Sequence, residues 1–388
     1  MQPRKLLTTV APSIIALLLV GAGFLTCRYL TVKVFDQEID SDAQAYTLGR
    51  LLKDQPEQRT AVASAYYDSA QALARLDTLS WAVPNIPTPF VGSAPAPGQQ
   101  GNAHINTMQF RAAREVAMPK PARTYRIFLT GGSTAFGNGA PSDDTTIAGY
   151  LNAILTRQLT PATGLNYEVF TMANSAWATT QERIIIENLL SELQPDMVIA
   201  VSGNNDVHWG ALGRNVLWFR SYADELFLSL IKAVYQLTGQ PPIPENTRIE
   251  PGPIAPAVIA GRLLKNVRIS AFVLAAANVD YVFVLQPTLA VSKKKLTRRE
   301  GARLVQRDYF RECYGLIAAA LTNLHDERFR FVDLSGLFDG AGEQEEIFLD
   351  SYHFGDRGNE QIATGIFLRI KDRIVSKSSG QERLGAVH

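Results

Sequence analysis

The chain has 388 residues, 46% of them hydrophobic, which is enough for one large domain with a sizeable core and an appendage. Its formal net charge of +1 excludes the strongly basic composition of a nucleic-acid-binding protein. Two cysteines and five histidines, without CxxC or HxxxH spacing, support neither a disulfide framework nor a metal centre. We therefore expect a globular protein that uses no metal or other cofactor and binds no nucleic acid.

The amino terminus carries a candidate membrane anchor. Basic residues precede an uncharged apolar run over residues 10–26, close to the ~20 residues that span a bilayer. A cleaved signal peptide is the main alternative, but no small-residue cleavage site follows, and the residues before Cys27 do not fit a lipoprotein signal. We expect residues 1–30 to form a cytoplasmic tail and a single transmembrane helix in a bacterial inner membrane, with the remainder facing the periplasm or the exterior.

Residues 31–102 follow the anchor and precede the main domain. From about Asp42 to Leu79, apolar residues recur at three- and four-residue intervals, which predicts a helical stalk or a hairpin packed on the main domain. The stretch from Trp81 to Asn102 is rich in proline and glycine, which predicts a linker or an extended wrap. The main domain is expected over 103–376, with a tail at 377–388.

Short apolar runs alternate with longer amphipathic ones in the main domain, which indicates an α/β fold with a mainly parallel sheet between helices. The predicted strands are Tyr125–Leu129, Tyr167–Met172, Met197–Val201, Tyr281–Leu285 and Phe329–Asp333. The predicted helices cover 147–158, 181–193 and 356–374. Because open α/β sheets bind ligands beyond the carboxyl ends of their strands, the segments after these strands are candidates for the functional site.

The turn after the first strand contains a candidate nucleophile. Gly131 and Gly132 allow a tight reversal, and Ser133 then stands where a following helix can present its amide to negative charge. The same pattern is found in ordinary turns and in phosphate cradles. Neither the GxSxG elbow nor a Walker lysine is present.

Two further segments follow strands. Asn205 lies in 203–206 after the third strand, where its side-chain amide either donates a hydrogen bond to an oxyanion or forms an Asx turn. A loop of small residues over 175–182 follows the second strand and could expose a backbone amide there.

Asp350 and His353 lie three residues apart, just before the last helix. An aspartate can hold a histidine in one tautomer, and that histidine can deprotonate a serine hydroxyl, which is a weak nucleophile on its own. This pair therefore predicts a base for Ser133. A helix cap beside a surface histidine is the alternative.

The order and spacing of these segments resemble the SGNH or GDSL hydrolase family, over roughly Tyr125 to Ile374. The matching blocks are Gly131–Gly137, Gly203–Asp206 and Asp350–His353. The resemblance implies a three-layer α/β/α sandwich with a flavodoxin-like sheet. It also implies a catalytic triad of Ser133, Asp350 and His353. It further implies an oxyanion hole formed by the backbone amides of Ser133 and Ala176 and the side chain of Asn205.

Two positions depart from the family pattern. Gly132 stands where the first block has aspartate, although GGS variants occur in the family. Alignment on Gln181-Glu182 places Ala176 at a glycine whose amide joins the oxyanion hole. Alanine keeps that amide, and a shift of one or two residues would bring Asn174 or Ala178 to this position instead.

The region after the third strand is a helical insertion at about 207–275, rich in large apolar residues. It is expected to be a cap that belongs to the core, or else a lid over a lipid substrate. His208 and Trp209 at its start, and Trp177 in the small-residue loop, are candidate substrate contacts. The basic run Ser292–Arg299 predicts a solvated loop or a contact for an anionic glycan or lipid headgroups.

The leading expectation is a serine esterase that removes acyl groups, above all acetyl, from a cell-envelope or extracellular carbohydrate. The alternatives are an O-acyltransferase with the same triad, a lipase or lysophospholipase, and a non-catalytic glycan-binding module. The complete set of Ser133, Asn205, Asp350 and His353 argues against the last. The expected partners are the acylated carbohydrate, or another ester substrate, and the membrane; the sequence assigns no protein partner.

Overall fold

The structure is a computed structural model that describes residues 18–29, 46–53, 55–214, 231–241 and 252–385. It divides into two compact units. The first comprises Met1–Gln44 and Leu226–Pro244, and its described residues contain helices at 18–29 and 231–237. No helix within the described ranges is both long and apolar enough to cross a membrane. Positions 10–17 of the expected anchor lie outside those ranges, so the anchor stays a prediction.

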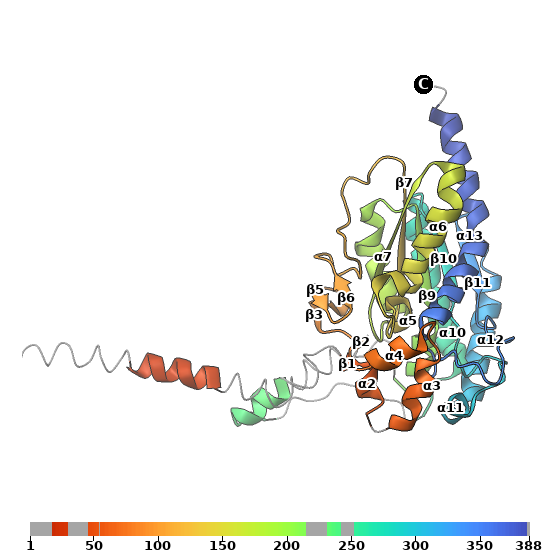
Figure 1. Ribbon diagram of the computed structural model, residues 1–388. Coiled ribbons are helices and arrows are strands. Elements are labelled where there is room, and N and C mark those ends of the chain that lie inside the picture. The colour runs from red at the N-terminus through yellow and green to blue at the C-terminus, as the bar shows by residue number, and fades with distance from the viewer. Residues whose placement is uncertain (1–17, 30–45, 54, 215–230, 242–251, 386–388) are drawn as a thin grey trace, which may run out of the picture. The chain divides into compact units, whose positions relative to one another are not determined.

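The second unit, Ala45–Glu225 with Glu245–His388, is built on a five-stranded sheet (Figure 1). The strands are β7 (Thr124–Gly131), β8 (Asn166–Ala173), β9 (Met197–Ser202), β10 (Asp280–Leu285) and β11 (Phe329–Asp333). They lie in the order β11-β10-β9-β7-β8, and every neighbouring pair is parallel. This is the doubly wound order 2-1-3-4-5, in which ligands bind where the order reverses. That point lies between β7 and β9.

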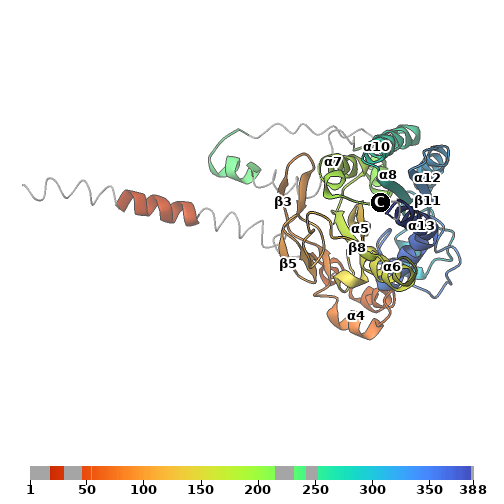
Figure 2. The same ribbon diagram turned by 90° about the horizontal axis from the view of Figure 1, so that it is seen from above.

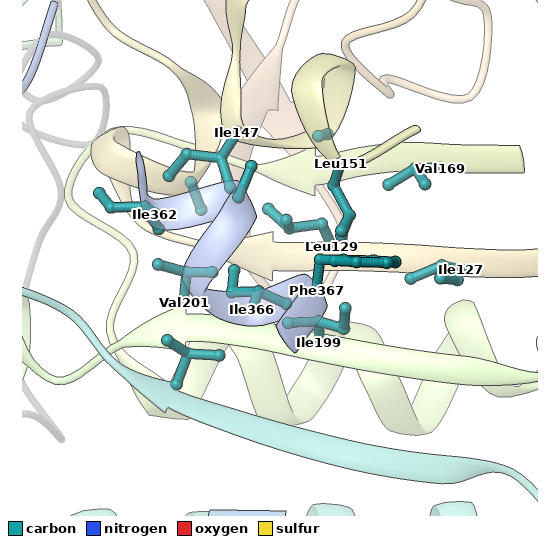
Figure 3. Close-up of a cluster of buried hydrophobic side chains, with 14 of the residues drawn as sticks. Ile127, Leu129, Ile147, Leu151, Val169, Ile199, Val201, Ile362, Ile366 and Phe367 are labelled. Atoms are coloured by element: carbon teal, nitrogen blue, oxygen red, sulfur yellow. The ribbon is translucent and has the colours of Figure 1, made fainter. Parts of the chain in front are cut away.

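Alternate side chains of each strand enter two cores, because successive residues of a strand point to opposite faces. Leu129 and Val201 pack with Ile366 in the first core, beneath α6 (Ile147–Thr163) and α13 (Asp356–Gly385) (Figure 3). Phe128 and Phe283 enter the second core. That core is covered by α7 (Thr179–Asn188), α10 (Pro256–Ala276) and α12 (Arg307–Thr322). Figure 2 shows α7 and α10 on the side of the strands away from α6.

The predicted α/β class with a parallel sheet between helices is confirmed. All five predicted strands and the three predicted helices are present. The middle helix is shorter than expected, since α7 ends at Asn188 and a 3-10 turn covers Leu190–Leu193. The last helix continues beyond 374 to Gly385. Three shorter helices lie near the carboxyl ends of the strands: α5 (Ser133–Phe136), α8 (Asn204–Ala211) and α11 (Arg298–Ala302).

The described parts of the predicted insertion, α8 and α10, belong to the core. Val207 of α8 and Leu263 and Leu274 of α10 are completely buried against the second face of the sheet. A lid formed by 215–230 or 242–251 would lie outside the described residues. The cap interpretation therefore holds for the two helices that border these segments.

Residues 46–105, called the N-terminal segment from here on, form neither a long stalk nor a free linker. Short helices replace the predicted long ones: α2 (Leu48–Leu51), a 3-10 turn (Pro56–Gln58), α3 (Arg59–Ala63) and α4 (Ser69–Arg75). Pro56 and the capping side chain of Asp68 start new turns and interrupt the helical pattern. Three small antiparallel pairs then form the predicted extended wrap: β1 (Tyr46–Thr47) with β2 (Ser80–Ala82), β3 (Asn85–Thr88) with β4 (Gly92–Pro95), and β5 (Gly98–Gln100) with β6 (Ala103–Ile105).

Candidate active site

Two glycines bring the ends of β7 and β9 together. Gly131 has a φ of +148°, and a Cβ atom there would lie 2.3 Å from the carbonyl oxygen of Val201. A Cβ atom on Gly132 would lie 2.3 Å from Nδ2 of Asn205. The amide of Asn205 thus fills the space beside position 132. This contact favours glycine at position 132.

Ser133, His353 and Asp350 form a continuous hydrogen-bonded chain. Ser133 Oγ lies 2.6 Å from His353 Nε2, and His353 Nδ1 lies 2.7 Å from Asp350 Oδ2. Ser133 and His353 are 7% and 4% exposed, so the contact between them is largely shielded from water. The structure therefore brings together the three residues of the predicted triad, in the geometry that proton transfer from serine to histidine requires.

Asp350–His353 form a loop, called the base loop from here on, and the backbone of this loop fixes the Asp350 carboxylate. Asp350 Oδ1 accepts hydrogen bonds from the backbone N–H groups of Tyr352 and His353, both at 2.9 Å. Burial by itself would raise the pKa of Asp350. The neighbouring His353 charge and the hydrogen bonds from His353 and the two amides outweigh burial, and the pKa is lowered. The carboxylate is therefore ionised at neutral pH and can hold the imidazole.

The base loop is attached to neighbouring strand ends. The carbonyl of Ser351 accepts hydrogen bonds from Leu289 N at 2.8 Å and Thr288 Oγ1 at 3.1 Å, both after β10. The carbonyl of Tyr352 accepts one at 3.0 Å from Thr134 Oγ1, the residue next to the nucleophile. These bonds fix the position of His353 relative to Ser133.

Three hydrogen-bond donors are the predicted ligands of an oxyanion: the backbone N–H groups of Ser133 and Ala176 and the side-chain amide of Asn205. Among the described residues, no acceptor lies within reach of the backbone N–H of Ser133 or Ala176. Asn205 Nδ2 donates to the carbonyl of Trp177 at 2.7 Å, which fixes the orientation of the amide and leaves its second hydrogen available. Ala176 has a φ of +69°, a left-handed conformation that favours glycine. The roles of Ala176 and Asn205 as oxyanion donors remain predictions.

Buried polar side chains of Asp206, Thr179 and Glu182 lie next to the segments that carry these donors. Asp206, next to Asn205, accepts hydrogen bonds from Thr179 N at 3.1 Å and Thr179 Oγ1 at 2.6 Å. Burial raises the pKa of Asp206, although the bonds from Thr179 oppose this. Burial also raises the pKa of Glu182 well above its usual value, and the nearby Asp206 adds to the effect. These contacts join the start of α8, which carries Asn205, to the loop that carries Ala176.

The structure treats the three candidate substrate contacts differently. The prediction for Trp177 is wrong, because its ring is completely buried and its Nε1 donates to the carbonyl of Ser93. Trp209 is 4% exposed and lies edge-on to His208, with ring centroids 4.9 Å apart. His208 is partly exposed and lies 6.0 Å from the ring of Tyr352, beside His353. His208 remains a candidate contact, and burial lowers its pKa.

The basic run is only partly a solvated loop. Lys294 is buried and forms an ion pair with Glu300 at 2.8 Å, and Arg299 forms one with Glu346 at 2.7 Å. Arg299 also donates to the carbonyl of Leu349, directly before Asp350. Arg299 therefore fixes the chain directly before Asp350, and neither of these two cations is available to an anionic glycan or lipid headgroup. Only the other lysines and Arg298 are exposed.

Sequence reasoning missed Trp81. This residue of β2 begins the stretch predicted as a linker or an extended wrap, and its ring centroid lies 4.6 Å from that of His353, with an angle of 69° between the ring planes. Tyr352 also contacts His353, with ring centroids 4.6 Å apart. The nearness of Tyr352 follows from its place in the base loop. No local sequence signal indicates the contact of Trp81.

No group of three or more His, Cys, Asp or Glu side chains in the described ranges is arranged to hold a metal ion. The described groups can act as a serine nucleophile, an imidazole base, an orienting carboxylate and a set of amide donors.

No protein-family model matches the sequence, and no curated protein matches it. Solved structures do align with the chain. An alpha/beta hydrolase enzyme from the metagenome of Lake Arreo is 14% identical, with 63% of this chain and 94% of that chain covered and a TM-score of 0.40. An acetylxylan esterase from Geobacillus stearothermophilus is 12% identical, with 63% and 94% covered and a TM-score of 0.38. A GDSL-like lipase from Bacteroides thetaiotaomicron is 12% identical, with 66% and 92% covered and a TM-score of 0.35.

Proposed function

We propose that this chain is a serine-dependent ester hydrolase of the SGNH or GDSL type. The observation that carries the proposal is the chain of contacts from Asp350 through His353 to Ser133, with distances of 2.7 and 2.6 Å. A weak nucleophile is joined to a base, and the base is joined to an orienting carboxylate. These three residues lie at the switch point of a doubly wound sheet, which supports the same proposal.

In the proposed reaction, Ser133 Oγ attacks the ester carbonyl carbon while its proton passes to His353 Nε2. Asp350 stabilises the imidazolium that forms. The amides of Ser133, Ala176 and Asn205 bind the oxygen that becomes negatively charged. The tetrahedral intermediate then expels the alcohol, which takes the proton from His353, and leaves an acyl group on Ser133. Water, deprotonated by His353, attacks this acyl-enzyme. The acid is released as the bond to Ser133 Oγ breaks and Ser133 Oγ takes the proton back from His353.

The proposed substrate is an acyl ester, above all an acetyl ester, of a cell-envelope or extracellular carbohydrate. Aromatic and imidazole rings lie around His353, namely those of Trp81, His208 and Tyr352. All three residues are partly exposed. Such rings offer apolar surface with polar edges, which suits the mixed C–H and hydroxyl surface of a sugar.

The proposed location is a bacterial inner membrane, with the hydrolase unit outside the cytoplasm. This proposal is supported only by the apolar run at 10–26. Membrane fractionation of cells that express the full chain, or a chain lacking 1–30, provides the test. Recovery of the full chain in the soluble fraction would refute the anchor.

The test of the proposed activity uses the purified full-length chain with p-nitrophenyl acetate. We expect Ser133→Ala to abolish turnover above background, because Ser133 Oγ is the hydroxyl that lies 2.6 Å from His353 Nε2. A fluorophosphonate should add to Ser133, as located by peptide mass spectrometry. A Ser133→Ala protein with unchanged turnover would refute the mechanism. An added glycan that captures the acyl group faster than water would assign the chain to the acyltransferases.

A further inference from the structure

The N-terminal segment contacts the nucleophile side of the site. Gly139, which follows α5, donates its N–H to the carbonyl of Ser80 at 2.9 Å. The carbonyl of Gly139 accepts a hydrogen bond from the buried Tyr66 hydroxyl at 2.8 Å. Asn102 Nδ2 donates to the carbonyl of Ala140 at 2.5 Å. Three residues of the segment therefore hold the chain that leads away from Ser133.

The same segment contacts two other loops of the site: the loop around Ala176 that follows β8, and the base loop at Asp350–His353. The carbonyl of Ser93 accepts hydrogen bonds from Trp177 Nε1 at 3.0 Å and Asn174 Nδ2 at 3.2 Å, on either side of Ala176. Leu349, directly before Asp350, is completely buried in a cluster whose other members belong to the segment. All three loops of the site thus pack against one part of the chain that lies outside the main sheet.

Trp81 is the residue of this segment that reaches the base itself. Its ring lies edge-on to the imidazole of His353, at 4.6 Å between centroids. Its neighbour Ser80 is held by Gly139 and by Asn102 Oδ1, the latter at 2.7 Å. The indole also packs against the cluster that includes Leu349. Trp81 therefore has a fixed position from which it can limit rotation of the His353 ring.

We propose that the N-terminal segment is a structural part of the active site, and that Trp81 is a positioning residue that keeps His353 aligned between Asp350 and Ser133. This inference rests on the proposed esterase function. The two hydrogen bonds of the imidazole share one ring plane, so rotation of the ring weakens both together. A ring held on one side by a fixed indole keeps both bonds while substrate enters and alcohol leaves.

The test compares Trp81→Ala, Trp81→Phe and Leu79→Ala in the full-length chain. Leu79 lies two residues before Trp81 and is 1% exposed in the same cluster, so its truncation weakens the segment without removing the ring beside His353. We expect Trp81→Ala to lower kcat and the rate of fluorophosphonate labelling by about 10-fold to 10²-fold with little change in KM, because small misplacements of catalytic groups have effects of this size. Trp81→Phe should restore most of the rate.

Proton NMR gives a readout that does not depend on turnover. The low-field proton on His353 Nδ1, assigned by its loss in His353→Ala, should broaden or shift in Trp81→Ala and remain in Trp81→Phe and Leu79→Ala. A Trp81→Ala protein with wild-type kcat and an unchanged Nδ1 proton would overturn the inference. An equal loss of rate and of the Nδ1 proton in Leu79→Ala would overturn the role of Trp81 as the positioning residue and would assign the effect to the segment as a whole. Neither result affects the esterase proposal, which fails separately if wild-type turnover does not depend on Ser133.

Discussion

Replacement of Asp350 by asparagine is expected to lower kcat by roughly 10⁴-fold, with the fold intact. Asp350 Oδ1 accepts two backbone hydrogen bonds at 2.9 Å, and an asparagine must keep its own oxygen there. The NH₂ group of the asparagine then takes the place of Asp350 Oδ2, which lies 2.7 Å from His353 Nδ1 in the wild-type protein. Because that NH₂ group only donates, Nδ1 must accept. The proton moves to Nε2, which then cannot take the proton from Ser133.

The measurement is steady-state hydrolysis of p-nitrophenyl acetate, with the melting temperature recorded for each variant. The chain offers a matched control in His104 and Asp143, whose Nδ1 and Oδ2 atoms are also 2.7 Å apart. Asp143→Asn makes the same chemical change in a second His–Asp pair. Because Asp143 Oδ1 also accepts a hydrogen bond from the buried Arg111 at 2.8 Å, the melting temperature of this variant should fall, while turnover of the folded protein stays within about three-fold, a change worth less than ~1 kcal/mol. If Asp350→Asn retained a tenth of wild-type turnover, Asp350 would not set the tautomer of His353.

The sheet and the Asp350–His353 pair could be predicted from the sequence because their signals are local, whereas the pairing of His353 with Ser133 across 220 residues was implied by the resemblance to a known family. Each buried strand is a short apolar run, and parallel strands bring their carboxyl ends to one edge, so Ser133 and Asn205 were expected to lie close together. The DxxH spacing brings Asp350 and His353 into contact within one loop. In this part of the chain, pattern and tertiary structure agree.

For the N-terminal segment, the sequence predicts helices that are too long and leaves open whether the proline-rich stretch is a linker or a wrap, because the structure of this segment depends on distant partners. Its strands have two to four residues, too few for a periodic signal, and its prolines are equally common in free linkers. The contact between Trp81 and His353 joins residues from opposite ends of the sequence. Composition alone cannot distinguish a linker from a wrap that is fixed by such contacts.

The basic run shows a signal that the sequence did contain. Thr297 and Glu300 have the spacing of a capping box, and both reciprocal hydrogen bonds are present at the start of α11. A capping box predicts an ordered helix start rather than a solvated loop. Recognition of this pattern would have placed Glu300 against the backbone N–H of Thr297, at the start of an ordered helix. The further contacts of Glu300 with the backbone of Ile347 and Phe348 depend on the fold and have no local signal.

Removal of the Asn205 amide is expected to lower kcat by about 10²-fold to 10³-fold and to change KM much less. The donor is partly exposed and already oriented by its bond to the carbonyl of Trp177. Its remaining hydrogen acts on charge that exists only in the transition state, so its loss affects kcat and kcat/KM alike. The measurement is kcat and KM of Asn205→Ala, with a melting curve because the carbonyl of Trp177 loses its donor.

Ala176→Gly is the matched control for Asn205→Ala, because it alters the same predicted oxyanion hole while it keeps the predicted backbone donor. Glycine also accepts the φ of +69° that strains alanine, which offsets the loss of one buried methyl group. We expect turnover of this variant within a few-fold of wild type, consistent with a backbone rather than a side-chain role. If Asn205→Ala instead raised KM and left kcat unchanged, Asn205 would bind the substrate in its ground state, and the oxyanion would depend on the two backbone amides alone.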